Sequence, residues 1–192
     1  MMVSYFRRIA LGSLFLMVCY IPVAMAQGDT KATRITLGSS SGTPGTSVVV
    51  PIYFTPTEGT EVGKLNLTVD FVSKNLKYSK MDPGIAAEMG NVDLATDVKE
   101  GKNDKDLETT TLNIVASFLT PDPPKGVPSG LLGYLTMKIN DDALTANITL
   151  TAKATATELK TNKDLPVESV NATVDVLAPG SQPLVTCFIF SH

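Results

Sequence analysis

The sequence lacks most of the residues on which enzymes and metal sites rely. Its 192 residues include no tryptophan, two cysteines and one histidine, and that histidine is the last residue, His192. A single terminal histidine excludes a serine–histidine–aspartate triad, an HExxH zinc site and a cluster of histidine ligands within this sequence. No G-x-S-x-G nucleophile motif and no phosphate-binding loop occur either.

Because no group of side chains with a shared chemistry stands out, we predict that the chain is not an enzyme. We expect no catalytic residues, no bound cofactor and no metal of its own. The alternative that remains is a glycosidase pair, in which the fold would bring two of the scattered carboxylates together.

The first residues lack acidic side chains, and their pattern is typical of a secretory signal peptide. Arg7 and Arg8 precede an apolar run over residues 9–24, and an A-x-A cleavage signal ends at Ala26. We therefore predict a signal peptide over residues 1–26, cleavage after Ala26, and a secreted or cell-surface protein with no membrane span. The alternative is a membrane anchor that is not cleaved.

Cleavage after Ala26 would leave 192 − 26 = 166 residues with 16 − 2 = 14 basic and 19 acidic side chains, a net charge of 14 − 19 = −5. A mildly acidic chain with no basic stripe is not expected to bind nucleic acid. One cysteine remains, Cys187, so no disulfide can form within the chain. The length is that of about one domain, which a hydrophobic core must stabilise.

Short threonine- and valine-rich segments separated by glycine and proline turns are the main positive signal. The clearest spans residues 64–71, where Leu65, Leu67, Val69 and Phe71 alternate with the polar side chains of Asn66, Thr68 and Asp70. We predict further strands over residues 34–38, 47–54, 75–80, 109–119, 131–139, 147–157 and 170–177. The pattern indicates an all-β sandwich of two antiparallel sheets in one domain, followed by a tail over residues 178–192.

The strand expected at residues 47–54 contains a proline near its middle, Pro51. Proline cannot donate a hydrogen bond to a β-ladder, so it is confined to sheet edges, strand starts and bulges. We therefore expect this strand either to lie at an edge or to change partners halfway along.

Residues 85–108 do not alternate, and we predict a short helical turn over residues 86–89 followed by a polar loop. Within this loop, hard oxygen ligands cluster between residues 101 and 108, at Asn103, Asp104, Asp106 and Glu108. The sequence does not match the EF-hand pattern, and lysines interrupt the cluster, so a solvated loop is favoured over a calcium site.

Five stretches, taken in order, resemble those of cohesin modules. They are GTPGTSVVVPIYF, LNLTVDFVSKNLKYSKMDPG, SGLLGYLTMKI and the pair ITLTAKATATEL and VNATVDVL. The resemblance covers residues 32–177, and we assign residues 27–177 to a cohesin-like domain. It implies a sandwich of about nine strands with jelly-roll topology, in which Pro51 marks the point where its strand passes from one sheet to the other. A departure is Phe71-Val72, where many cohesins have a Tyr-Asp pair.

The resemblance also implies a function. Cohesins bind dockerin modules, which carry the calcium themselves, and so assemble polysaccharide-degrading enzymes. By resemblance, the partner-binding residues would lie on one flat sheet face, at Asn66, Thr68, Asp70, Asn113, Val115 and Ser117.

Two other non-catalytic functions remain open. The first is a carbohydrate-binding module that uses Tyr53, Tyr78 or Tyr134 as a stacking platform, although aromatics make up only 6% of the sequence. The second is a structural protein of the cell surface, in which the apolar tail around Cys187 docks elsewhere or pairs with another thiol.

Overall fold

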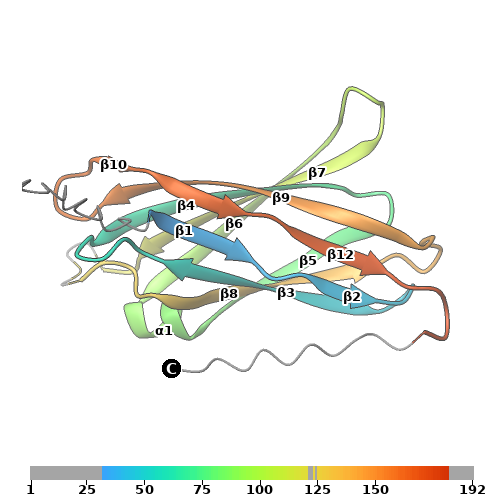
Figure 1. Cartoon of the computed structure of the whole chain (residues 1–192), viewed down its shortest axis with the longest axis horizontal. Coiled ribbons are helices and arrows are strands. Elements are labelled where there is room, and N and C mark those ends of the chain that lie inside the picture. Colours follow the sequence, from blue (N-terminus) through green and yellow to red (C-terminus); the bar gives the residue numbers. More distant parts are fainter. Residues whose placement is uncertain (1–31, 121–122, 124, 182–192) are drawn as a thin grey trace, which may run out of the picture.

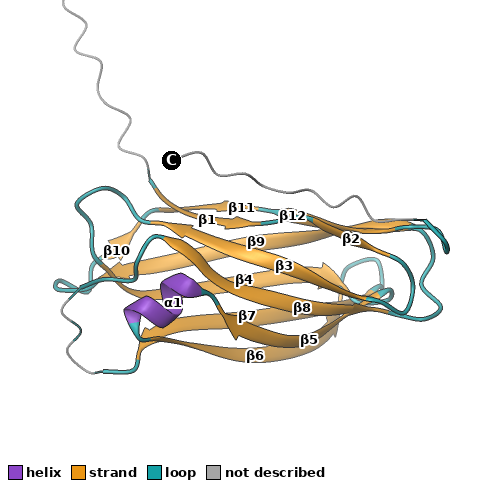
Figure 2. Ribbon diagram, turned by 90° about the horizontal axis from the view of Figure 1, so that it is seen from below, coloured by secondary structure: helices purple, strands orange, loops and turns teal. Residues whose placement is uncertain are grey.

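The computed structural model of the chain describes residues 32–120, 123 and 125–181, which form two β-sheets packed face to face (Figures 1 and 2). The order of strands in the five-stranded sheet is β11-β1-β3-β8-β5, and in the larger sheet it is β2-β12-β9-β4-β7-β6, with β10 paired to β9. The strands are β1 (Thr33–Leu37), β2 (Ser40–Gly42), β3 (Ser47–Thr55), β4 (Val62–Val72), β5 (Leu76–Pro83), β6 (Val92–Lys102), β7 (Glu108–Phe118), β8 (Gly130–Ile139), β9 (Ala146–Glu158), β10 (Asp164–Leu165), β11 (Val167–Val170) and β12 (Ala172–Val176). The predicted two-sheet sandwich is confirmed.

The alternating strands build one core between the sheets. In β4 every second side chain is buried, from Leu65 to Phe71, and β3 and β8 supply matching rows around Phe54 and Leu135. Each buried aliphatic or aromatic side chain contributes roughly 1.5–3 kcal/mol of transfer free energy. This is the hydrophobic core that the sequence was expected to require.

Three of the twelve strands, β2, β10 and β11, have two to four residues each, which accounts for the excess over the nine strands that the resemblance implies. These segments carry too few residues to show an alternating pattern. Two of them make parallel pairs, β1 with β11 and β2 with β12, so the sheets are not wholly antiparallel. The first two described strands, β1 and β2, therefore run beside the last two, β11 and β12.

An ion pair reinforces the parallel pair of β1 and β11. Arg34 and Glu168 lie opposite each other in the register, and the guanidinium donates two hydrogen bonds to the carboxylate, at 3.1 Å from Nε and 2.9 Å from Nη2. Through these bonds and the opposite charge, Arg34 lowers the pKa of Glu168, and Glu168 raises the pKa of Arg34. Both side chains are exposed, so their contribution to stability is small.

The expectation that the strand containing Pro51 passes from one sheet to the other was wrong. All of β3 stays in the five-stranded sheet, with Pro51 opposite Tyr134 of β8. The change occurs in the neighbouring segment instead. β1 pairs with β3 as far as Leu37, and after Gly38 the chain enters β2 in the other sheet. Pro51 thus lies where the ladder between β1 and β3 ends, which is where a missing N–H costs least.

Residues 85–108 were predicted only in part. The short helix is present as α1 (Ile85–Gly90), but the expected polar loop is the eleven-residue strand β6. It forms a hairpin with β7 whose far end projects beyond the sandwich (Figure 1). Most of β6 is exposed on both faces, so it has no buried row of side chains and shows no alternation in the sequence.

The predicted signal peptide, residues 1–26, lies outside the described residues, as does the tail from residue 182 onward, including Cys187. Within the part of the chain that is described, no helix is long and apolar enough to cross a membrane.

Candidate partner-binding face

The outer face of the larger sheet contains all six residues predicted to bind a partner. Side chains alternate along a strand, and the buried row of β4 includes Leu65, Leu67, Val69 and Phe71, so Asn66, Thr68 and Asp70 point to the opposite face. The same parity places Asn113, Val115 and Ser117 of β7 on this face, because β7 buries Leu112, Ile114 and Ala116.

The register brings five of these six residues into adjacent rows. Asn66 lies opposite Val115, and Thr68 lies opposite Asn113, to whose Oδ1 its hydroxyl donates a 3.1 Å hydrogen bond. Asp70 accepts a 2.6 Å hydrogen bond from the Thr111 hydroxyl. Ser117 lies apart from β4 and is paired with Asp93 of β6. The cross-strand bonds hold the polar side chains in place, so these side chains are preorganised for binding.

Two further strands complete the face, and their residues were not among the six predicted to bind a partner. On one side of β4, β9 contributes Thr151, Lys153 and Thr155 in the same rows, and Asn66 donates a 3.3 Å hydrogen bond to the Thr155 hydroxyl. The alternation of β9 could have identified these three residues. On the far side of β7, β6 adds Ala95, Asp97 and Lys99, which no signal indicated because β6 was expected to be a loop.

The charges on this face balance one another. Lys153 Nζ lies 4.0 Å from a carboxylate oxygen of Asp70, and Lys99 Nζ lies 3.8 Å from one of Asp97. Val115 lies between Asn66 and Ala95 in its row, with polar rows on either side. An apolar centre within a polar rim is the composition expected of a surface that binds protein.

A hollow lies at one end of the face, where β4 and β9 separate. Their pairing ends at Asp70 opposite Thr151; beyond it β4 continues beside β7 and β9 beside β12. The hollow has a volume of about 590 Å³, with Phe71 and Ile148 at its base and Leu107 from the hairpin on its wall. It could take a side chain that protrudes from a partner.

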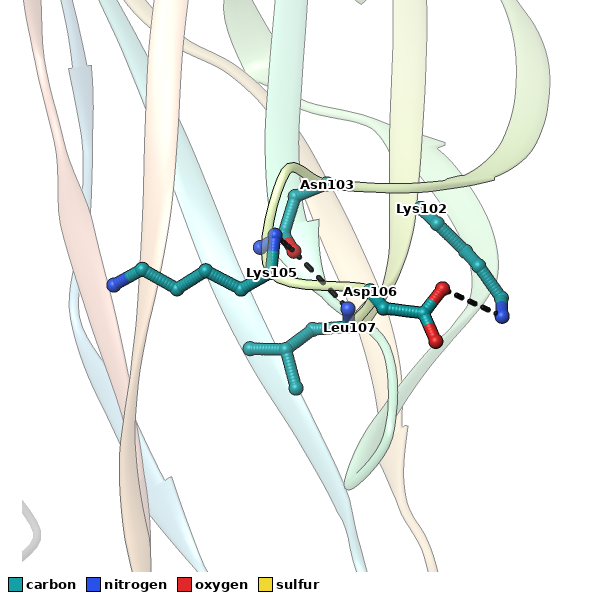
Figure 3. A network of polar contacts seen from close by, with 5 residues as sticks. All are labelled: Lys102, Asn103, Lys105, Asp106 and Leu107. Carbon is teal, nitrogen blue, oxygen red and sulfur yellow. Dashed lines mark hydrogen bonds and ion pairs between the residues drawn. The ribbon is translucent and has the colours of Figure 1, made fainter.

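The hairpin tip between β6 and β7 contains the residues weighed as calcium ligands, and two of these, Asn103 and Asp106, are engaged in bonds within the loop (Figure 3). Asn103 Oδ1 accepts hydrogen bonds from the backbone N–H of Lys105 and of Leu107, each at 3.0 Å. Asp106 is paired with Lys102 at 2.8 Å. No group of three or more histidine, cysteine or acidic side chains converges in a metal-binding arrangement anywhere in the described residues.

The three tyrosines considered for sugar binding are in different environments. Tyr78 packs against the core, and its hydroxyl shares a 3.3 Å hydrogen bond with the Thr96 hydroxyl. Tyr53 and Tyr134 lie on the outer face of the five-stranded sheet, on the neighbouring strands β3 and β8, and Tyr134 is 36% exposed. They are on the opposite side of the molecule from the candidate face.

Comparison with known proteins gives a family match. A family model described as the cohesin domain matches residues 33–176, from the first residue of β1 to the last of β12. No curated protein matches this sequence.

Several solved structures share the fold. One is the sixth cohesin of scaffoldin B from Acetivibrio cellulolyticus, solved in complex with a Cel5 dockerin mutant; it is 16% identical, with a TM-score of 0.59, over 76% of this chain and 99% of its own. The third cohesin of ScaC from the same organism, in complex with the ScaB dockerin, is 17% identical with the same TM-score and the same coverage. A non-cellulosomal cohesin from Archaeoglobus fulgidus is 17% identical, with a TM-score of 0.55, over 78% of this chain and 94% of its own.

Proposed function

This chain belongs to the cohesin domain family, and we propose that it is a non-catalytic module that binds a dockerin-like protein through the outer face of its larger sheet. The observation that carries this proposal is the match of the family model across the whole sandwich, β1 to β12. Similar structures that were solved in complex with dockerins support the class of partner. In this proposal calcium belongs to the dockerin, and this chain needs no metal of its own.

The six predicted residues form part of the proposed binding surface, together with Thr111, Lys153 and Thr155. Val115 would be the apolar centre, and the hydrogen-bonded pair of Thr68 and Asn113 would present fixed polar groups beside it. Binding energy in such interfaces is concentrated in a few central residues. The hollow beside Asp70 would accept an anchoring side chain of the partner.

We further propose that the chain is secreted and that its partner is carried by polysaccharide-degrading machinery. The signal-peptide pattern of residues 1–26 supports secretion, and the scaffoldin origin of two similar structures supports the setting. The non-cellulosomal cohesin from Archaeoglobus fulgidus is a reason to test that setting separately from the binding itself.

The test is a calcium-dependent capture experiment. Residues 27–192 are immobilised and exposed with calcium to the secreted proteins of the source organism, then eluted with a chelator. We expect a dockerin-bearing protein in the eluate, and its other modules would reveal whether it degrades polysaccharides. An empty eluate, or a partner bound equally well without calcium, would count against dockerin binding.

A second candidate function, glycan binding, is favoured by one observation. Tyr134 and Tyr53 lie on adjacent strands of the five-stranded sheet, on one outer face, and aromatic rings in that position can stack on sugars. This function would be supported if Tyr134→Ala no longer bound soluble polysaccharides while Val115→Lys still did. If both variants still bound them, the outer face of the five-stranded sheet would be excluded as the sugar-binding surface.

A further inference from the structure

The edge strand β6 leaves a continuous row of backbone hydrogen-bonding groups unpaired. Its eleven residues are paired only with β7, without a bulge, and no other described strand is paired with its backbone. Figure 2 shows β6 at the margin of its sheet. Long edges without a bulge or a proline are the ones that recruit a further strand.

The hydrogen bonds at the two ends of the hairpin show which residues face this free edge. The Asn103 N–H donates to the Leu107 carbonyl at 3.0 Å, and the Leu119 N–H donates to the Asn91 carbonyl at 2.9 Å. Hydrogen-bonded pairs alternate along an antiparallel ladder, so the odd-numbered residues of β6 bond to β7. The N–H and C=O groups of the even-numbered residues therefore point away from β7; these are Val92, Leu94, Thr96, Val98, Glu100 and Lys102.

The side chains of β6 restrict what can pair with this edge. Asp97 and Lys99 point outward beside each other, Glu100 and Lys102 carry charge on the inner side, and Val98 is 42% exposed. An uncharged strand would offer these charges no partner across the edge, whereas a strand with the opposite order of charges would place an opposite charge beside Asp97 and Lys99. An antiparallel copy of β6 has that order.

We propose that two copies of this chain pair through β6, antiparallel and around a two-fold axis at Val98. In this register, Asp97 of each copy lies opposite Lys99 of the other, and the two Val98 side chains meet at the axis. Five of the six residues that face the free edge then find a partner: Val98 pairs with Val98 of the other copy, Thr96 with Glu100 and Leu94 with Lys102. Only Val92, at the start of the strand, is left without one.

The neighbouring registers are less favourable. An axis at Asp97 would place the two Asp97 carboxylates directly opposite each other, and an axis at Lys99 would do the same with the two ammonium groups; like charges in such positions destabilise a sheet. An axis at Thr96 would leave the backbone of Lys102 unpaired in place of that of Val92, and it would place Asp97 opposite the uncharged Ala95. The register with its axis at Val98 is thus the one in which Asp97 and Lys99 both lie opposite a side chain of opposite charge.

The fold leaves the free edge of β6 accessible to a second copy of the chain. The far half of the hairpin stands clear of the sandwich, so a second hairpin can lie beside it (Figure 1). Pairing extends the larger sheet across both copies and directs both candidate binding faces to the same side. One paired edge buries less than the roughly 1,200 Å² of a stable interface, so we expect a weak, concentration-dependent dimer.

The experiment measures self-association of residues 27–192, which contain both sheets and the whole core, with no partner present. Sedimentation is followed under reducing conditions, so that Cys187 cannot link two chains, from about 10 µM to about 1 mM at low salt. We expect Asp97→Lys and Lys99→Asp each to weaken the dimer at least tenfold. An equimolar mixture of these two variants is expected to recover association, because each then meets opposite charges. Asp142→Lys, an exposed change of the same charge away from β6, serves as the control.

A backbone variant makes the test independent of charge. In Val98→Pro the lost N–H faces the free edge, so the ladder with β7 is kept, while the central pair of the dimer is removed. Amide exchange at Val98 and Glu100 should slow with concentration in the unmodified chain. A monomer at every concentration, or a dimer that neither Val98→Pro nor Asp97→Lys weakens, would overturn the proposal.

Discussion

Gly38 lies directly against the ring of Pro51, at the point where the N-terminal segment leaves one sheet for the other. The Gly38 N–H donates a 2.8 Å hydrogen bond to the Pro51 carbonyl, and a Cβ on Gly38 would lie 2.5 Å from the proline Cγ. Proline has no N–H with which to return the bond, so the ladder stops here. The pair sets where β1 ends and where the crossing into β2 begins.

The close approach predicts that Gly38→Ala destabilises the fold. The added methyl group must displace the Pro51 ring, and overpacking of this kind costs about 1–3 kcal/mol. Denaturant unfolding of both forms would measure the loss. Gly101→Ala is the matched control, because the nearest atom to its added Cβ is the Thr109 hydroxyl oxygen at 3.8 Å. Equal stability of the two variants would contradict this account of the crossing.

How much could be predicted from the sequence depended on whether a strand has a buried face. β4 was predicted with its inward and outward residues correct, because Leu65 to Phe71 contact the core and the alternation records that contact. β6 was expected to be a loop, because most of it projects past the core and its order comes from pairing with β7. A strand held by its partner alone leaves no periodic signal in its own residues.

The same limit applied to the candidate face. Asn66, Thr68 and Asp70 were found because they alternate with the core row of β4, whereas Asp97 could not be placed beside them before β6 was known to be a strand. The proline signal was physically correct but assigned to the wrong strand. Pro51 does mark a break in a ladder, and the strand that departs is its neighbour β1. A proline in the sequence shows that one ladder hydrogen bond is missing, but it does not show which neighbouring strand ends at that point.

Val115 is the residue at which dockerin binding is best tested by substitution. We expect Val115→Lys to weaken the binding of the calcium-dependent partner roughly tenfold or more, because a charge replaces the apolar centre of the face. The folded domain should be unaffected, since the side chain points outward. Val49→Lys is the control: Val49 is 47% exposed on the outer face of the five-stranded sheet. Titration calorimetry of both variants would decide, and equal loss of affinity in the two would place the binding surface elsewhere.

The ion pair of Arg34 and Glu168 predicts a small acid-dependent term in stability. Because the pKa of Glu168 is lower in the folded chain, its contribution is present above the unfolded pKa of about 4.3 and is lost as the pH falls through the folded value. Arg34 stays charged throughout this range. We therefore expect the Tm of Glu168→Gln to lie slightly below that of the parent chain near neutral pH and to converge with it in acid. A difference in Tm that persisted unchanged to about pH 2 would show that the pair acts through packing rather than charge.

Asn103 predicts a local effect that separates the hairpin from the rest of the fold. Its side-chain oxygen accepts two backbone N–H bonds in the turn, where Asp106 adopts a left-handed conformation with φ at 57°. Asn103→Ala removes both bonds, so the amides of Lys105 and Leu107 should exchange with solvent much faster. The free energy of global unfolding should change little, because the turn lies beyond the core.

Asp104→Ala is the control for this prediction, because the Asp104 side chain makes no hydrogen bond or ion pair among those observed in the turn. Faster exchange confined to the turn in Asn103→Ala would establish that the hairpin tip is ordered by its own side chains. Faster exchange that spread along β6 as far as Thr96 would mean that the edge strand depends on the turn. In that case Asn103→Ala should also weaken the proposed pairing of two β6 edges, which links the order of the tip to the assembly of the chain.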